Sequence, residues 1–149
     1  MGMDVTESLE VASAPAAVFA WVDALDRYPR WLDIVVRAES ADAAPGDPGP
    51  AWRVDLRGRL GPLSRAKRLR MVRTVHDAPR RAVFERREVD GRSHSPWVLD
   101  ATVDPAPSGA RLTMRLHYGG SLWGPVLERM LRDEVERSRP RLAAAVGGA

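Results

Sequence analysis

Apolar residues recur along the chain with two different periods, and the order of these periods predicts an α+β fold. Alternation with a period of two, typical of strands, marks a first segment at residues 4–12. A further extended run begins at Ile34. After a loop rich in Pro and Gly, alternation returns near residues 51–60, 65–76, 81–89, 92–104 and 110–118. We therefore expect seven strands, most of them consecutive, as in an antiparallel sheet.

Between the first strand and the others, the apolar residues have the spacing of a helix. Pro15 is favoured in the first turn of a helix, and Ser13 or Ala14 stands near the N-cap. The apolar stripe of this helix is Val18, Phe19, Val22 and Leu25. A second short helical segment is expected at residues 26–32.

The chain closes with an amphipathic helix from Ser121 to about Leu142. Its apolar face consists of Leu122, Trp123, Val126, Leu127, Met130, Leu131 and Val135. At 1.5 Å per residue, the part from residue 122 to residue 139 spans roughly 27 Å, enough to lie across a small sheet. We expect Pro140 to kink or end it.

The dipeptide Asp90-Gly91 predicts a two-residue hairpin and with it the register of the central strands. Counting outward from the turn places Phe84 opposite Trp97 and Ala82 opposite Leu99. The apolar parity of these strands then identifies the inner face, and Val75 fits it if it lies opposite Ala82. In the neighbouring strands the same face carries Trp52, Val54, Leu56, Leu69, Met71, Leu112, Met114, Leu116 and Tyr118.

Several polar residues share this inward parity. They are Arg73, Arg86, Glu88, Ser93, Ser95 and Tyr118, with Glu7 if Val5 and Leu9 point inward. An ionised group is not stable unpaired in a dry core, so each must pair, reach the rim or line a wet cavity. For Arg73 and Arg86 both cavity lining and structural pairing stay open. All three histidines take the outward parity, which disfavours histidine catalysis inside the core.

Composition narrows the function classes. The 149 residues are 44% apolar and 29% charged, typical of one folded domain over residues 1–149. Cysteine is absent, and no cluster of His and carboxylates has metal-ligand spacing, so we expect neither a metal nor a cofactor. No segment is apolar enough to span a membrane, and the N-terminus does not resemble a signal peptide, so a cytoplasmic protein is expected. Residues 50–92 hold 13 basic and 5 acidic side chains.

The order of one strand, two short helices, six strand segments and a long helix resembles the START-like superfamily, also called Bet v 1-like or SRPBCC. The stretches that carry the resemblance are residues 12–19, 26–31 and 108–113 and the closing helix. It implies a helix-grip fold, in which a curved antiparallel sheet wraps around a long C-terminal helix. Members bind lipids, sterols, polyketides, quinones or hormones in a pocket between sheet and helix, and some cyclise or dehydrate a polyketide. No catalytic motif can be carried over to this chain.

Helix-grip geometry implies which residues line the pocket, with ordinary core packing as the alternative for the aliphatic ones. The expected ligand-binding residues are Met71, Arg73, Phe84, Arg86, Ser95, Trp97, Leu99, Met114, Leu116, Tyr118, Trp123, Leu127 and Met130. Whether the protein is an enzyme stays open. In a cofactor-independent polyketide cyclase or dehydratase, Arg73 or Arg86 would stabilise a developing enolate and Tyr118 would donate or relay a proton.

A second hypothesis is a binding module that uses the outer face of the sheet. That parity collects the basic residues Arg53, Arg57, Arg59, Arg68, Arg70, Arg81, Arg87, Arg111 and Arg115, relieved by Asp55 and Glu85. The partner would be RNA or a ribosomal surface, anionic lipid or an acidic protein. Nucleic acid is disfavoured because this face lacks aromatic residues for base stacking, and a solvated basic surface is the simpler interpretation. A homodimer through this face stays open.

Overall fold

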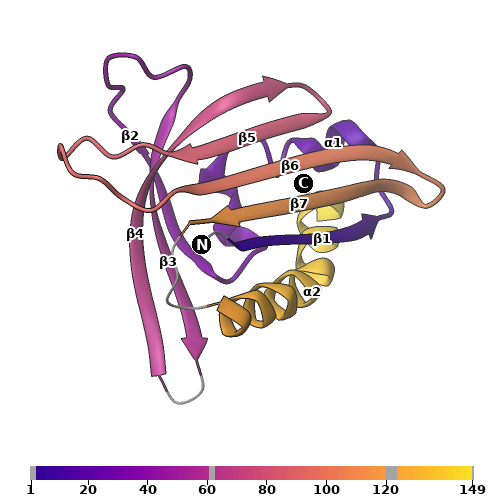
Figure 1. Cartoon of the computed structure of the whole chain (residues 1–149). Helices are drawn as coiled ribbons and strands as arrows, with labels where there is room; N and C mark the ends of the chain where they lie inside the picture. Colours follow the sequence, from indigo (N-terminus) through magenta and orange to yellow (C-terminus); the bar gives the residue numbers. More distant parts are fainter. Residues whose placement is uncertain (1–2, 61–62, 120–123, 149) are drawn as a thin grey trace.

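The computed structural model describes residues 3–60, 63–119 and 124–148 and shows a curved sheet wrapped around one long helix (Figure 1). Its elements are β1 (Met3–Val11), α1 (Pro15–Phe19), the 3-10 helix η1 (Leu25–Arg30), β2 (Val35–Ala41), β3 (Ala51–Leu60), β4 (Leu63–Asp77), β5 (Arg81–Arg86), β6 (Trp97–Ala106), β7 (Gly109–Tyr118) and α2 (Gly124–Gly148). The strands form one antiparallel sheet in the order β1-β7-β6-β5-β4-β3-β2. The helix-grip prediction is confirmed.

The first helix is shorter than its apolar stripe predicts. It ends at Phe19, and two side chains from η1 and the residue after it donate to backbone carbonyls of the segment that follows the helix. The Trp31 indole Nε1 donates to the Trp21 carbonyl at 3.0 Å, and the Tyr28 hydroxyl donates to the Val22 carbonyl at 2.9 Å. Since side chains satisfy these carbonyls, the segment needs no continuous helix to bury them.

The predicted hairpin at Asp90-Gly91 is wrong in its register. The structure pairs Phe84 with Leu99 instead of Trp97, a shift of two residues. Gly91 has a positive φ of 74°, but Asp90 does not, as a type I′ turn would require. The Asp90 carboxylate instead accepts from the backbone N–H of Arg92 at 3.0 Å, within a loop between β5 and β6. A shift of two residues preserves the face of every side chain, so the inner parity of β6 stands.

A β-bulge near the end of β4 makes the predicted orientation of its last side chains wrong. The pairing with β5 shifts between Arg73 and Val75, so that Val75 lies opposite Val83 and His76 lies opposite Ala82. Because the extra residue reverses the parity beyond it, Val75 is 37% exposed, contrary to its predicted inward position. His76 takes the inner parity instead and stacks on Phe19 with ring centroids 5.8 Å apart. The prediction that all three histidines face outward therefore fails at His76.

The closing helix also departs from its predicted end. It continues through Pro140 to Gly148. The buried Leu142 lies in the core beyond the proline, and Arg141 donates to the Arg30 carbonyl at 3.1 Å. These contacts hold the last turns on η1, which outweighs the hydrogen bond that Pro140 removes.

Arg70 anchors two loops on the outer face of the sheet. Its side chain is only 6% exposed and pairs with Asp47 at 2.8 Å. The same guanidinium donates to the Asp42 carbonyl at 2.7 Å and to the Arg87 carbonyl at 3.0 Å. Hydrogen bonds from Arg70 and from the Ala44 backbone lower the pKa of the Asp47 carboxyl. Arg70, which the sequence analysis assigned to the basic outer surface, is thus engaged in contacts within the protein.

Candidate ligand cavity

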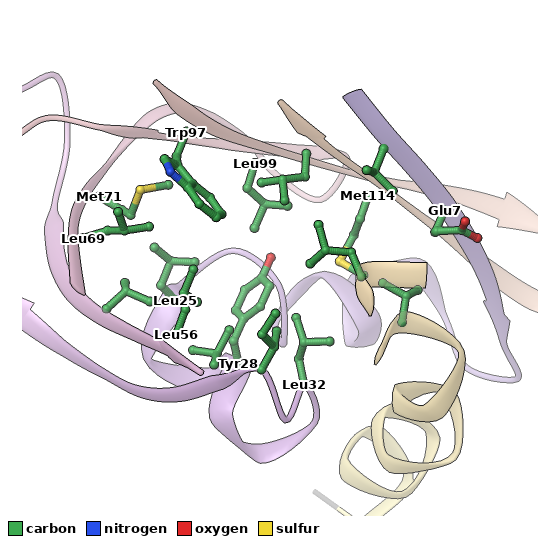
Figure 2. Close-up of a pocket in the computed structure, with 17 residues that line it drawn as sticks. Glu7, Leu25, Tyr28, Leu32, Leu56, Leu69, Met71, Trp97, Leu99 and Met114 are labelled. Carbon is green, nitrogen blue, oxygen red and sulfur yellow. The ribbon is translucent and has the colours of Figure 1, made fainter. Parts of the chain in front are cut away.

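An apolar cavity of about 100 Å³ lies between the inner face of the sheet, η1 and α2 (Figure 2). Seventeen residues line it, all but one of them apolar or aromatic. They are Val5, Glu7, Leu25, Tyr28, Leu32, Ile34, Val35, Val54, Leu56, Leu69, Met71, Trp97, Leu99, Met114, Leu116, Leu131 and Val135. The alternation of the strands puts these side chains on one face, and the curvature of the sheet brings them together.

The structure places five of the expected ligand-binding residues in this wall. They are Met71, Trp97, Leu99, Met114 and Leu116. They come from β4, β6 and β7. The parity of these strands is the signal that located them.

Sequence reasoning missed the part of the wall built by η1 and β2. Leu25, Tyr28 and Leu32 come from η1 and the residues after it, Val35 begins β2, and Ile34 directly precedes it. The helical spacing of residues 26–32 predicts a short helix but does not show that it borders a cavity. Its run of apolar and aromatic residues was the available signal.

The two candidate arginines lie away from the cavity wall. Arg73 donates to the Asp23 carbonyl at 2.8 Å. Arg86 pairs with Glu88 at 2.7 Å and donates to the Ser95 carbonyl at 3.2 Å, and its side chain is 8% exposed. Both guanidinium groups are engaged by the protein, so stabilising an enolate in the cavity would require either one to leave its partner.

Three further candidates, Phe84, Tyr118 and Met130, are not among the residues that line the cavity. Phe84 is fully buried against Tyr28, which lines the cavity, and against Trp52. The Tyr118 ring packs on Trp97 with centroids 4.7 Å apart. Met130 is half-buried on α2. Trp123 and the side chain of Leu127 lie outside the described residues.

Three polar groups border the apolar wall. The Glu7 carboxylate pairs with Arg132 of α2 at 3.2 Å, and Figure 2 shows Glu7 at the opposite end of the cavity from Trp97. The Tyr28 hydroxyl is bound to Val22, as described above. The third group is the indole N–H of Trp97, whose nitrogen is buried.

Burial raises the pKa of the Tyr28 hydroxyl well above its ordinary value of 10, and the Asp23 carboxylate raises it further. As the pH rises, the tyrosine therefore ionises first in the unfolded chain. The stability that the protonated Tyr28 hydroxyl contributes is complete below about pH 10 and is lost as the pH rises above it.

We expect Tyr28→Phe to be less stable at pH 8 but to lose stability less steeply between pH 9 and 11. Urea denaturation of both proteins across this range tests this. Parallel declines would contradict the assignment.

The outer face is not a uniform basic surface. Across the strands, four of its predicted arginines pair with acids: Arg68 with Asp55, Arg81 with Asp100, Arg111 with Glu10, and Arg115 with Asp4. Arg70 is buried with Asp47, as described above. This pairing reduces the positive charge available to an anionic partner.

Two further observations concern the part of the chain that the structure describes. Within it, no group of three or more His, Asp or Glu side chains is arranged to hold a metal ion. None of its helices combines the length and the apolar character needed to cross a membrane.

A family model matches residues 3–147 of the chain. The chain belongs to the polyketide cyclase/dehydrase and lipid transport family. This confirms the resemblance on which the helix-grip expectation rests. A search of curated proteins gave no match.

Solved structures similar to this member of the family share its fold at low sequence identity. A protein of Thermus thermophilus is 16% identical with a TM-score of 0.75, over 98% of each chain. A START superfamily protein from Mycobacterium smegmatis is 15% identical with a TM-score of 0.73, over 97% of each chain. The di-domain ARO/CYC StfQ of steffimycin biosynthesis is 19% identical with a TM-score of 0.68, over 99% of this chain and 51% of its own. The chain thus spans about half the length of StfQ.

Proposed function

We propose that the protein binds an apolar small molecule of the polyketide, lipid or quinone class in the cavity between the sheet and α2. The observation that carries the proposal is the wall itself, in which sixteen of seventeen side chains are apolar or aromatic. Displacing water from such a wall favours an apolar guest. The family, whose description names polyketide cyclases, dehydrases and lipid transport, supports the same class of ligand.

The volume of the cavity limits the size of the guest. Sites for drug-sized ligands enclose roughly 300–1,000 Å³, and an apolar cavity of ~150 Å³ accepts benzene. At about 100 Å³, the cavity is smaller than one that accepts benzene, so its wall must adjust to admit a guest of that size or larger. Met71 and Met114 supply flexible, unbranched side chains for that adjustment.

Binding, rather than turnover, is the activity that this geometry supports best. A cyclase would need a group that stabilises the developing enolate, and both arginines proposed for that role are held by Asp23, Glu88 or Ser95. We therefore propose a binding protein, and cyclisation stays a hypothesis that turnover assays with a poly-carbonyl substrate would address.

Filling the cavity is expected to abolish binding. Leu99 is half-buried in the wall, so Leu99→Trp places a larger side chain in the space that the ligand would take. The matched control is Val98→Trp, one residue earlier on β6 and on the other face. Cumene, a compact apolar probe, should bind the wild-type protein and Val98→Trp but not Leu99→Trp, measured by NMR chemical-shift titration. Equal binding by both variants would place the site elsewhere.

A further inference from the structure

The indole N–H of Trp97 is a buried hydrogen-bond donor that the fold leaves unused. Trp97 is 7% exposed, and among the described residues no protein atom accepts a hydrogen bond from its Nε1. Two other tryptophans show the usual arrangement, since Trp31 donates to the Trp21 carbonyl at 3.0 Å and Trp52 donates to Asp26 at 3.1 Å. Buried donors are rarely left without an acceptor, because the group loses its hydration and gains nothing in return.

The position of this donor connects it with the cavity. Trp97 is part of the wall, and in Figure 2 its nitrogen lies on the side of the ring that faces Met71, another wall residue. Tyr118 covers the ring with centroids 4.7 Å apart, which fixes the plane of the indole. The thioether of Met71 has three rotatable bonds, so it can shift and admit a ligand atom beside the N–H.

The surroundings favour an acceptor over a donor on the ligand. In the strand register, Arg86 of β5 lies opposite Met71 of β4. The preceding residue, Glu85, lies opposite Val98 of β6. Arg86 therefore lies between Met71 and Trp97 in the sheet. The Arg86 guanidinium itself is held by Glu88 and by the Ser95 carbonyl. The indole N–H of Trp97 is therefore the group that attracts a ligand atom here, and it attracts an oxygen that carries partial negative charge.

We propose, on the basis of the binding function above, that the ligand is a compact apolar molecule with a carbonyl-type oxygen that accepts a hydrogen bond from Trp97 Nε1. A pure hydrocarbon of the same size gains from the apolar wall but leaves the donor unpaired. A carbonyl compound gains from both. Of a hydrocarbon and a carbonyl compound of equal size, the Trp97 N–H therefore favours the carbonyl compound.

A matched pair of probes tests this. Acetophenone and cumene have the same number of non-hydrogen atoms, and the carbonyl oxygen of the first replaces a methyl group of the second. Trp97→Phe removes the N–H and keeps an aromatic ring. We expect it to weaken acetophenone binding about three- to tenfold, the effect of one neutral hydrogen bond, with cumene binding changed less than about twofold. Comparing the two ratios cancels the different hydration of the probes.

Trp52→Phe is the control, because it removes an indole N–H that is already bonded to Asp26, away from the cavity wall. It should leave the acetophenone-to-cumene ratio unchanged. In the wild-type protein, one of the five tryptophan indole signals in a proton–nitrogen NMR spectrum should move downfield with acetophenone, and Trp97→Phe should lack that signal.

Each outcome separates this inference from the proposed function. If cumene binds and the ratio is the same with and without the Trp97 N–H, this inference is wrong and the binding function stands; a water fixed on the indole would give that result. If neither probe binds the wild-type protein, the proposed function fails and this inference with it.

Discussion

Replacing Arg70 with Met is expected to lower the free energy of unfolding by roughly 3 kcal/mol, because a buried ion pair loses one partner. The Asp47 carboxylate, 7% exposed, would keep its charge without a counter-ion, and the carbonyls of Asp42 and Arg87 would lose their donor. Met retains most of the aliphatic stem of Arg70, so lost packing contributes little. Urea denaturation monitored by circular dichroism measures the change.

Arg68→Met is the matched control for this prediction. Arg68 lies on the same strand and the same face and pairs with Asp55 at 2.7 Å, but its side chain is 67% exposed. Exposed pairs contribute little to stability, so the control should unfold close to the wild-type midpoint. Equal losses from the two variants would show that burial does not distinguish the pairs. Adding Asp47→Leu to Arg70→Met should restore part of the loss, since it removes the unpaired charge.

Truncating Phe84 to Ala is expected to cost about 4 kcal/mol, the usual range for removing a buried aromatic ring. The ring is fully buried, with the Trp52 ring at 5.7 Å and the Tyr28 ring at 6.3 Å, both edge-to-face. Its loss leaves a void beside Tyr28, which lines the cavity. Phe84→Leu fills most of this void and should lose less than half as much stability in the same denaturation experiment. Similar losses for the two variants would contradict close packing at this position.

The face of each strand could be predicted from the sequence, whereas the exact pairing could not. Side-chain parity has a period of two, so a two-residue error in the β5–β6 register still placed Trp97 and Leu99 on the inner face. At the end of β4 the same reasoning failed, because one extra residue near Thr74 reverses the parity of Val75 and His76. A bulge has no signature in the alternation until the pairing strand is known.

The cavity was predictable on the side of the sheet and not on the side of η1. Alternation identifies the inner face of a strand, but whether Tyr28 or Leu32 packs in the core or borders a void depends on the angle at which η1 meets the sheet. The backbone partners of Arg73 and Arg86 were equally hidden. The Asp23 and Ser95 backbone carbonyls that accept from them are groups that every sequence position carries.

The anchoring of α2 sets the free energy at which the cavity opens. Its C-terminal half is fixed by the buried Ser138 and Leu142 and by the hydrogen bond from Arg141 to η1. Among the described side chains, the turns that border the cavity contribute the half-buried Met130, Leu131 and Val135 and the pair between Glu7 and Arg132. Local opening of these turns leaves every strand pairing intact. A ligand of the proposed class would therefore exchange with solvent through the opening of this half of α2, without unfolding of the sheet.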